Sequence, residues 1–400
     1  MHLDLSLLQN NFNNQYFQKS FHYEMVSFYV IMILVIYMRG LYIHIPFCKR
    51  LCTFCDFPKR INQNDIVIAN YLKKLKKEII ELNETDVDTI YIGGGTPNAL
   101  SIDQLEELLI TIRNKHYSNI IEYTIETNYE LITLEQIKLF KKYNINRVSI
   151  GVQTLIKDTA ANINRYCNYE ELKEKIILLK ENGIVNINLD FIFGLPNETI
   201  NDVKHNLKCI RELDVKHISY YSLILEDKTV LSHQLSNNMT TLPNDDLTTE
   251  MYQLIIKEMN EMGYHHYEIS NFSKSGYESK HNLIYWNLDE YIGLGVSAAS
   301  LYNGYRIYNS KLITNYMYNN DIIKEEISID QTKGEYFWLG LRMIDGVSIE
   351  KYKNKFNSNP FDDFNINELI NKKLLTIEND YLKLTQLGLE HGNYVFTYFI

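Results

Sequence analysis

Residues 41–57, LYIHIPFCKRLCTFCDF, hold three of the five cysteines of this 400-residue chain. Cys48, Cys52 and Cys55 are spaced C-x3-C-x2-C. The first five residues of the stretch alternate and are rich in β-branched and aromatic side chains, which predicts a strand. Because Pro46 ends that strand, we expect the three cysteines to lie on the loop that follows it.

The chemistry of the cysteine triplet favours an iron–sulfur cluster. A [4Fe-4S] cluster normally takes four thiolates, so three cysteines on one loop leave one iron open for another ligand. Zinc is the alternative, but a structural zinc site needs four ligands, commonly in paired short spacings, and the sequence has no second CxxC. Cys167 and Cys209 lie far along the chain, and His44, on the extended strand, is poorly placed as a fourth ligand. A disulfide would leave one of the three cysteines unpaired.

The triplet, with the aromatic Phe54 before its last cysteine, resembles the radical S-adenosylmethionine (SAM) superfamily. The resemblance implies a [4Fe-4S] cluster whose open iron binds the amino and carboxylate groups of SAM. It also implies that an electron from the cluster breaks the sulfonium bond and gives a 5′-deoxyadenosyl radical. The cofactor supplies this chemistry, and the protein positions it and excludes water.

A length of 400 residues allows one large domain and a smaller one. An apolar fraction of 45% is enough for a sizeable core, and the formal net charge of −10 argues against a protein that binds nucleic acid by neutralising phosphates. The main basic cluster, residues 73–77, falls in a predicted amphipathic helix and is expected on its solvated face. The sparse cysteines outside the triplet suit a reducing cytoplasm.

Residues 1–37 differ from the rest of the chain, because a polar, Asn- and Gln-rich start is followed by an apolar run from Met25 to Met38. That run is shorter than the roughly 20 residues needed to span a bilayer. It lacks the basic flank and the small-residue cleavage site of a signal peptide. We therefore interpret residues 1–37 as an extension ahead of a functional start at Met38, with a membrane-surface segment as the alternative.

From residue 41 onward, short apolar strands alternate with helical patterns. This alternation predicts a parallel sheet with right-handed crossovers, an α/β fold in the form of a partial (β/α)6 barrel open on one side. The predicted strands are residues 41–45, 88–92, 122–127, 147–150, 185–193 and 217–225. The predicted helices between them are residues 64–82, 102–114, 134–143, 169–182 and 199–213.

Ligand-binding residues in such barrels gather at the carboxyl ends of the strands. Gly93, Gly94 and Gly95 end the second predicted strand and would let the backbone approach a ligand closely. A carboxylate at this rim can accept hydrogen bonds from ribose hydroxyls, and Arg165 can bind the SAM carboxylate through two hydrogen bonds. The convergence of several such side chains on one rim favours a binding role over a purely structural one.

Five motifs narrow the resemblance, since YIHIPFC, GGGTP, SIGVQ, DFIFGLP and GLGVSA occur in this order. Together they resemble the coproporphyrinogen dehydrogenase family and its close relatives, the HemW-type heme chaperones, over residues 38–400. The resemblance implies that one or two SAM molecules are bound. The residues that it places at SAM are Tyr42, Phe54, Gly94, Gly95, Thr96, Glu126, Gln153, Arg165, Asp190, Ile224 and Ala299.

The resemblance also suggests a domain organisation. It implies a radical SAM barrel at residues 38–270, a heme-motif and barrel-closing segment at 271–325, and a small winged-helix-like domain at 326–400. Within these, residues 293–297 are expected to return the chain to the open barrel edge. Residues 366–375 are predicted to be helical, and residues 381–384 to form part of a strand pair before a last helix.

Three features distinguish the branches of this family. The dehydrogenase has a fourth cysteine two residues after the third, where this chain has Phe57, and residues 1–37 do not resemble the segment that precedes the dehydrogenase cluster. His281, Tyr285 and Trp286 form an HNxxYW motif that resembles the heme-binding segment of the HemW branch. A histidine can ligate heme iron, and the two aromatic side chains offer flat apolar area to a porphyrin. The alternative is that these are packing residues.

The sequence therefore favours a cytoplasmic heme chaperone that holds a [4Fe-4S] cluster, SAM and heme and delivers heme to apo-hemoproteins. A position at the inner face of the membrane is the alternative location. The alternative function is an oxygen-independent coproporphyrinogen III dehydrogenase, which would need an electron donor such as flavodoxin or ferredoxin. A radical methylase or RNA-modifying enzyme is disfavoured by the acidic balance and by the lack of a basic RNA-binding module.

Overall fold

A twelve-stranded sheet forms the centre of the structure, a computed structural model that describes residues 38–61, 64–117, 119–319 and 321–400. Its strand order in these residues is β14-β13-β12-β11-β1-β4-β5-β6-β7-β8-β10-β9. The strands predicted from the sequence lie side by side and parallel, which confirms the partial barrel. They are β1 (Gly40–Ile45), β4 (Thr89–Gly94), β5 (Glu122–Asn128), β6 (Arg147–Gln153), β7 (Asn186–Phe193) and β8 (His217–Ser222).

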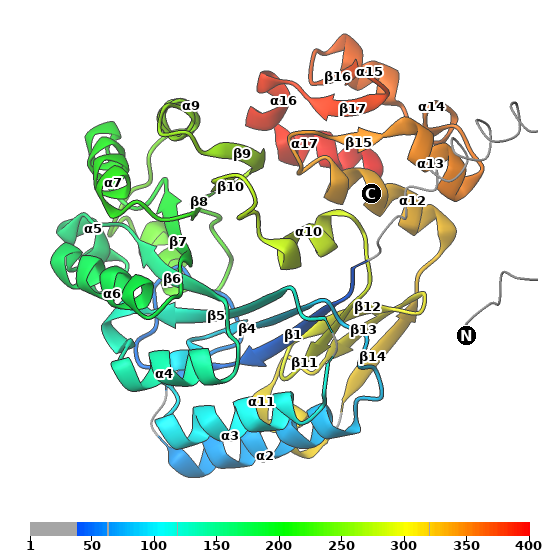
Figure 1. Cartoon of the computed structure of the whole chain (residues 1–400). Helices are drawn as coiled ribbons and strands as arrows, with labels where there is room; N and C mark the ends of the chain where they lie inside the picture. The colour runs from blue at the N-terminus through cyan, green and yellow to red at the C-terminus, as the bar shows by residue number, and fades with distance from the viewer. Residues whose placement is uncertain (1–37, 62–63, 118, 320) are drawn as a thin grey trace, which may run out of the picture. The chain divides into compact units, whose positions relative to one another are not determined.

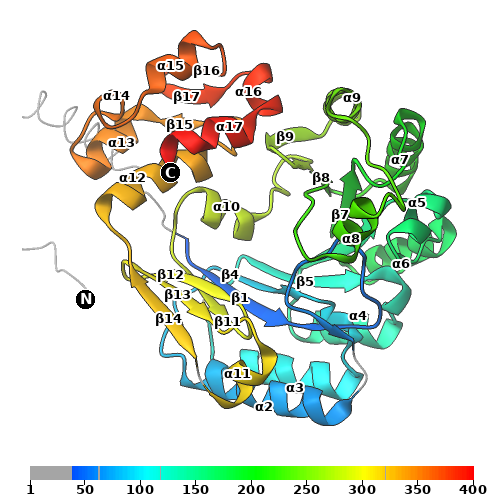
Figure 2. The same cartoon turned by 180° about the vertical axis from the view of Figure 1, so that it is seen from behind.

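Helices cover the outer face of the curved sheet, and α10 lies on its inner side (Figure 1; Figure 2 from behind). The helices start where the sequence supplies caps. The Asn64 side chain accepts the amide of Ile66, and Ser101 and Gln104 cap each other's amides. These outer helices are α2 (Asp65–Glu81), α3 (Ile102–Arg113), α4 (Leu134–Lys142), α5 (Lys157–Asn162), α6 (Tyr169–Glu181) and α7 (Ile200–Leu213).

A further parallel strand, β11 (Tyr291–Leu294), pairs with β1 on the side opposite β4. This confirms that residues 293–297 return the chain to the barrel edge. Glu78 of α2 holds the turn after β11, because its carboxylate accepts hydrogen bonds from the Gly295 amide and the Asn309 side chain, each at 3.0 Å. The sheet then continues antiparallel through β12 (Ala299–Tyr302), β13 (Tyr305–Asn309) and β14 (Ile322–Glu326), with α11 (Ile313–Tyr318) between the last two.

The sequence pattern assigns no element to residues 226–273, where the structure has two helices and two short strands. These are α8 (Val230–Ser236), α9 (Asp245–Glu261), β9 (His265–Glu268) and β10 (Asn271–Ser273). The predicted strand at 217–225 is too long, because β8 ends at Ser222 and both Ile224 and Leu225 are exposed. In the described residues no helix is long and apolar enough to cross a bilayer, and the 1–37 extension lies outside them.

The C-terminal part has its own apolar core around Phe337, Tyr352 and Leu382. A three-stranded antiparallel sheet, β15-β17-β16, packs with short helices, so the predicted strand pair gains a third strand. The helix predicted over 366–375 is shorter, because Lys373 adopts a left-handed φ of 59° and a strand begins at Leu375. The elements are α12 (Ile329–Gly340), β15 (Val347–Ser348), α13 (Ile349–Phe356), α14 (Pro360–Asp363), α15 (Ile366–Asn371), β16 (Leu375–Glu378), β17 (Tyr381–Leu384), α16 (Gln386–Glu390), α17 (Gly392–Phe396) and η4 (Thr397–Phe399).

Helix α10 (Lys280–Trp286) closes the barrel at the amino ends of its strands. Glu122, the first residue of β5, accepts hydrogen bonds from the amides of Lys280 and His281, each at 3.0 Å. Glu122 and Arg147 are both almost fully buried, and their charged groups lie 3.9 Å apart. One carboxylate therefore caps α10 and balances a buried guanidinium.

We expect Glu122→Ala to destabilise the protein by about 3–5 kcal/mol, because the change leaves the Arg147 charge buried and unpaired. Glu122→Gln keeps an acceptor for the α10 amides and should fall between the alanine variant and wild type. Urea denaturation measures the effect. The control is Glu81→Ala, which removes an exposed ion pair with Lys77. Equal losses for Glu122→Ala and Glu81→Ala would contradict the structural role of Glu122.

Candidate functional site

The cysteine loop is fixed at both ends and along its length. It begins in β2 (Phe47–Cys48), which pairs with β3 (Arg60–Ile61). The amide of Thr53 donates to the carbonyl of Ile163 at 3.1 Å, and the Thr53 carbonyl accepts from the amide of Leu231 at 2.9 Å. The loop is therefore held against α5 and α8, at the carboxyl ends of the strands.

Cys48 is buried, Cys52 and Cys55 are partly buried, and the cations Lys59 and Arg165 lie close by. Burial raises the pKa of Cys48 and of Cys52, while the Thr96 hydroxyl acts in the opposite direction on Cys48, and Arg165 does so on Cys52. Within the described residues, no three His, Cys, Asp or Glu side chains converge on a point that could hold one metal ion. A [4Fe-4S] cluster makes a different demand, because each cysteine binds a separate iron. Three thiols on one loop can each supply one thiolate to such a cluster.

Gly94, the last residue of β4, and Gly95 bring the backbone close to the cysteine loop. A Cβ at Gly95 would lie 3.0 Å from the sulfur of Cys48, and one at Gly94 would lie 2.5 Å from the His44 ring. Gly94 also has a φ of +112°, a backbone angle that residues with a side chain rarely adopt. The amide of Gly94 donates to the Glu126 carboxylate at 2.8 Å. This segment can therefore present backbone groups to a ligand beside the thiols.

Glu126 and Asp190 place two partly buried carboxyl groups on the inner side of the barrel. The pKa of Glu126 is raised to about 7, mainly by burial and also by the charge of Asp190, while hydrogen bonds from the Tyr91 hydroxyl and the Gly94 amide act in the opposite direction. Burial also raises the pKa of Asp190, against hydrogen bonds from Ser149 and Asn188. Each carboxyl oxygen of Glu126 keeps a lone pair for a ligand hydroxyl.

Arg165 and Gln153 present unpaired polar atoms to the same region. Nη2 of Arg165 donates to Asn128 Oδ1 at 2.7 Å and to the carbonyl of Gly151, but its buried Nε has no hydrogen-bond partner. Oε1 of Gln153 is also buried and without a partner. Buried polar atoms are rarely left unpaired unless a ligand or water completes them, so this corner can accept a polar ligand such as a carboxylate.

The other predicted SAM residues are spread more widely. Phe54, on the cysteine loop, packs against an apolar cluster of Ile163, Ile192 and Leu195. Ile224 lies beyond the end of β8 and is 68% exposed, so the structure does not bring it to the buried part of the site. Ala299 and Tyr42 line a cavity of about 300 Å³.

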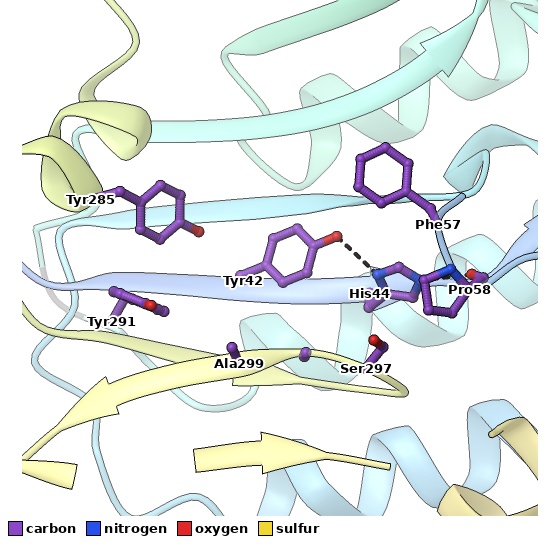
Figure 3. Close-up of a pocket in the computed structure, with 9 residues that line it drawn as sticks. Tyr42, His44, Phe57, Pro58, Tyr285, Tyr291, Ser297 and Ala299 are labelled. Carbon is purple, nitrogen blue, oxygen red and sulfur yellow. Dashed lines mark hydrogen bonds between the residues drawn. The ribbon is translucent and has the colours of Figure 1, made fainter. Parts of the chain in front are cut away.

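This cavity runs from the cysteine loop to α10. Figure 3 shows Tyr42 lying along β1 between Tyr285 and the loop residues Phe57 and Pro58. The Tyr42 hydroxyl bonds to Nδ1 of His44 at 2.9 Å, and Nε2 of His44 meets the carbonyl of Pro58 at 3.2 Å. His44 therefore supports the loop that follows the cysteines. The remaining lining residues are Tyr291, Ser297, Ala298 and Ala299.

The three residues of the predicted heme motif face different surroundings. His281 is buried, its ring nitrogens bond to the hydroxyls of Thr89 (2.7 Å) and Tyr285 (2.8 Å), and burial lowers its pKa to about 3. Tyr285 lines the cavity. Trp286 instead stacks with the guanidinium of Arg342, which lies 4.5 Å from the indole centre. Tyr285 meets both of the other rings edge-on, with ring centres 5.2 Å from His281 and 6.5 Å from Trp286.

Tyr91, Asn128 and His44 are site residues that the sequence reasoning did not assign. Tyr91 donates to Glu126 at 2.7 Å and stacks on His281 with ring centres 5.1 Å apart, so it touches both the rim and the heme motif. A signal existed for two of them: Tyr91 lies two residues before Gly93, on the same strand face, and Asn128 directly follows the predicted strand 122–127.

Comparison with known proteins gives two family models that match parts of the chain. The Radical SAM superfamily model matches residues 42–210, and the HemN C-terminal domain model matches residues 335–391. A solved structure of the HemN coproporphyrinogen III oxidase from Escherichia coli superposes with a TM-score of 0.77 at 20% identity and covers 90% of each chain. At that identity the likeness shows the fold alone.

Curated relatives match nearly the whole chain. A Lactococcus lactis protein named heme chaperone HemW is 36% identical over 371 residues, which cover 90% of this chain and 96% of the relative. A Bacillus subtilis protein of the same name is 35% identical, over 91% of this chain and 99% of the relative. The HemW protein of E. coli is 31% identical over 65% of this chain.

We expect the stability of the cluster-free protein to fall between about pH 4.5 and 7 through Glu126, because its pKa rises from 4.5 to about 7 on folding. The folded state binds the proton more tightly, so the loss of stability that comes from ionising Glu126 is absent below this window and complete above it. Glu126→Gln should gain roughly 3 kcal/mol over wild type across the window. Its amide can still accept from Gly94 and donate to the Tyr91 hydroxyl. Urea denaturation at several pH values measures this, and exposed Glu135→Gln is the control. Parallel profiles for wild type and Glu126→Gln would contradict the assignment.

Proposed function

Because the chain belongs to the family of proteins named heme chaperone HemW, we propose that it binds heme and delivers it to apo-hemoproteins. One structural observation at the candidate site supports the proposal. A single cavity is lined by Phe57, next to the cysteine loop, and by Tyr285 of the HNxxYW helix. The elements proposed for the cluster and for heme thus share one space, with apolar walls suited to a flat ligand.

Membership in the radical SAM superfamily implies a [4Fe-4S] cluster and SAM, which together supply one-electron chemistry when bound. We assign the cluster to Cys48, Cys52 and Cys55. The amino group of SAM would meet the backbone of Gly94 and Gly95, beside Thr96. The other residues proposed to contact SAM are Tyr42, Phe54, Glu126, Gln153, Arg165, Asp190, Ile224 and Ala299.

Different residues of this chain can bind different parts of SAM. Arg165 has an unpaired Nε close to Cys52, so its guanidinium can bind a carboxylate there. Glu126 can accept from ribose hydroxyls while it keeps its bonds to Gly94 and Tyr91. Phe54, packed into its apolar cluster, excludes water from below the loop. The buried setting strengthens each of these interactions.

Heme would enter the cavity beside Tyr285. For His281 to ligate heme iron, one of its bonds to Thr89 and Tyr285 must break, which costs about 0.5–1.5 kcal/mol per bond. Ligation by His281 therefore requires a change in these side-chain contacts. The acceptors are apo-hemoproteins, and a flavodoxin or ferredoxin would serve as electron donor where SAM is cleaved. We place the protein in the cytoplasm.

The dehydrogenase alternative is less favoured because Phe57 takes the place of a cysteine. Phe57 is 62% exposed and contributes an apolar wall to the cavity. An exposed phenyl ring at this point offers contact area for a porphyrin and no thiol for chemistry.

The reconstituted protein should leave coproporphyrinogen III unchanged. The assay is anaerobic, with SAM, a reductant and the substrate, and the porphyrins are separated by chromatography. A coproporphyrinogen dehydrogenase run in parallel shows that the conditions allow turnover. Protoporphyrinogen formed together with matching 5′-deoxyadenosine would refute the chaperone assignment.

Heme titration tests the heme motif. We expect His281→Ala to raise the heme Kd about tenfold, or about 1.4 kcal/mol, because a ligand to iron is lost. His265→Ala is the matched control, since His265 is an exposed histidine on the nearby strand β9. A Kd for His281→Ala equal to that of wild type, or a larger effect of His265→Ala, would remove His281 from the heme site.

A further inference from the structure

Asn128 ends β5 and lies at the centre of a chain of hydrogen bonds. Its Oδ1 accepts from Arg165 Nη2 at 2.7 Å, and its Nδ2 donates to the hydroxyl oxygen of Thr96 at 3.4 Å. The Thr96 hydroxyl in turn donates to the sulfur of Cys48 at 3.5 Å. One buried amide thus joins the guanidinium assigned to SAM with a thiol assigned to the cluster.

The direction of this chain follows from the donors present. A guanidinium has only donors, so Asn128 must turn its oxygen toward Arg165 and its NH2 toward Thr96. The hydroxyl of Thr96 receives that hydrogen bond, which leaves its own proton for the sulfur of Cys48. The cationic end of the chain therefore fixes the orientation of the last donor.

The backbone of Asn128 is held so that the side chain cannot move away. Its amide donates to Asn98 Oδ1 at 3.0 Å, and its carbonyl accepts from Asn98 Nδ2 at 3.1 Å. Gln136 of α4 secures Asn98 by donating to its carbonyl at 3.0 Å. Asn98, Gln136 and Thr96 are all buried, as is Asn128. A fully paired polar network of this kind is rigid.

We propose that Asn128 is a positioning residue that orients Arg165 toward SAM and directs the Thr96 hydroxyl proton onto the sulfur of Cys48. The inference rests on the proposed cluster and SAM site. Hydrogen bonds to cluster sulfurs raise the reduction potential of an iron–sulfur cluster, because they stabilise the extra negative charge of the reduced form. Asn128 would therefore set the potential through Thr96 and the SAM affinity through Arg165.

Aspartate cannot replace asparagine in this role. A carboxylate would accept from Arg165, but it has no donor for Thr96 and would attract the Thr96 hydroxyl proton away from the sulfur. It would also neutralise the guanidinium. Asn128→Asp should therefore lower the midpoint potential and raise the SAM Kd about tenfold.

The experiment is a double-mutant cycle on the reconstituted protein, with midpoint potentials from a redox titration followed by electron paramagnetic resonance. Asn128→Asp and Thr96→Val should each lower the potential, whereas Thr96→Ser should keep the wild-type value. The added charge of Asn128→Asp acts in both backgrounds and cancels in the cycle. The part of the potential shift that acts through the Thr96 hydroxyl should vanish in the Thr96→Val background. Asn128→Asp should therefore shift the potential less in that background than in wild type.

Asn146→Ala is the matched control. The Asn146 side chain accepts a hydrogen bond from the amide of Tyr123 at 2.8 Å, at the start of β5, whereas Asn128 is the last residue of that strand. Asn146→Ala should leave both the potential and the SAM Kd unchanged. Where Asn128→Asp does not fold, Asn128→Ala takes its place in the SAM titration, and its Kd should also rise about tenfold because Arg165 loses its support.

Equal potential shifts for Asn128→Asp in both backgrounds, with an unchanged SAM Kd, would overturn the role of Asn128 while the cluster site stands. A wild-type protein that gains no iron–sulfur signal on reconstitution would overturn the proposed site itself. The two failures are therefore distinguishable.

Discussion

The register between β1 and β4 is the constraint on which the site depends. It places His44 opposite Gly93 and Ile45 opposite Gly94, so the glycine segment and the cysteine loop leave the sheet side by side. A shift of one residue would turn every side chain to the other face. It would also separate the Gly95 backbone from the sulfur of Cys48, and the Glu126 carboxylate from the Gly94 amide. The site therefore depends first on the pairing of these strands, and the individual side chains can act only once that pairing has formed.

Much of this arrangement could be predicted from sequence because it is local. Strand ends, helix caps and the cysteine spacing are encoded within short windows, so the rim from Gly94 to Asp190 follows from the order of strands. The strand β11 could not be predicted as a parallel partner, because four residues carry little periodicity and their pairing with β1 is non-local. Leu375 was placed in a helix because its apolar spacing continues past Lys373, whose left-handed backbone ends the helix.

Side-chain pairing was the least predictable part. The sequence indicates that His281 belongs to a motif, but not that Thr89 and Tyr285 occupy both ring nitrogens. It indicates that Asn128 follows a strand, but not that its amide joins two functional groups. Such contacts depend on which strands are neighbours and on side-chain rotamers, and a short stretch of sequence determines neither of them. Buried polar side chains were therefore the main source of missed site residues.

The pairing of β1 with β11 has a consequence for synthesis on the ribosome. Gly40 pairs with Tyr291, so one edge of β1 has no partner until the chain is nearly three-quarters made. At about 5–20 residues per second, that wait lasts roughly 10–50 s. Throughout it the nascent chain carries an apolar, open strand edge next to three free thiols, which is a setting for misfolding and oxidation. Early pairing of β4 with β1 covers the other edge, so the vulnerable interval ends only when β11 emerges.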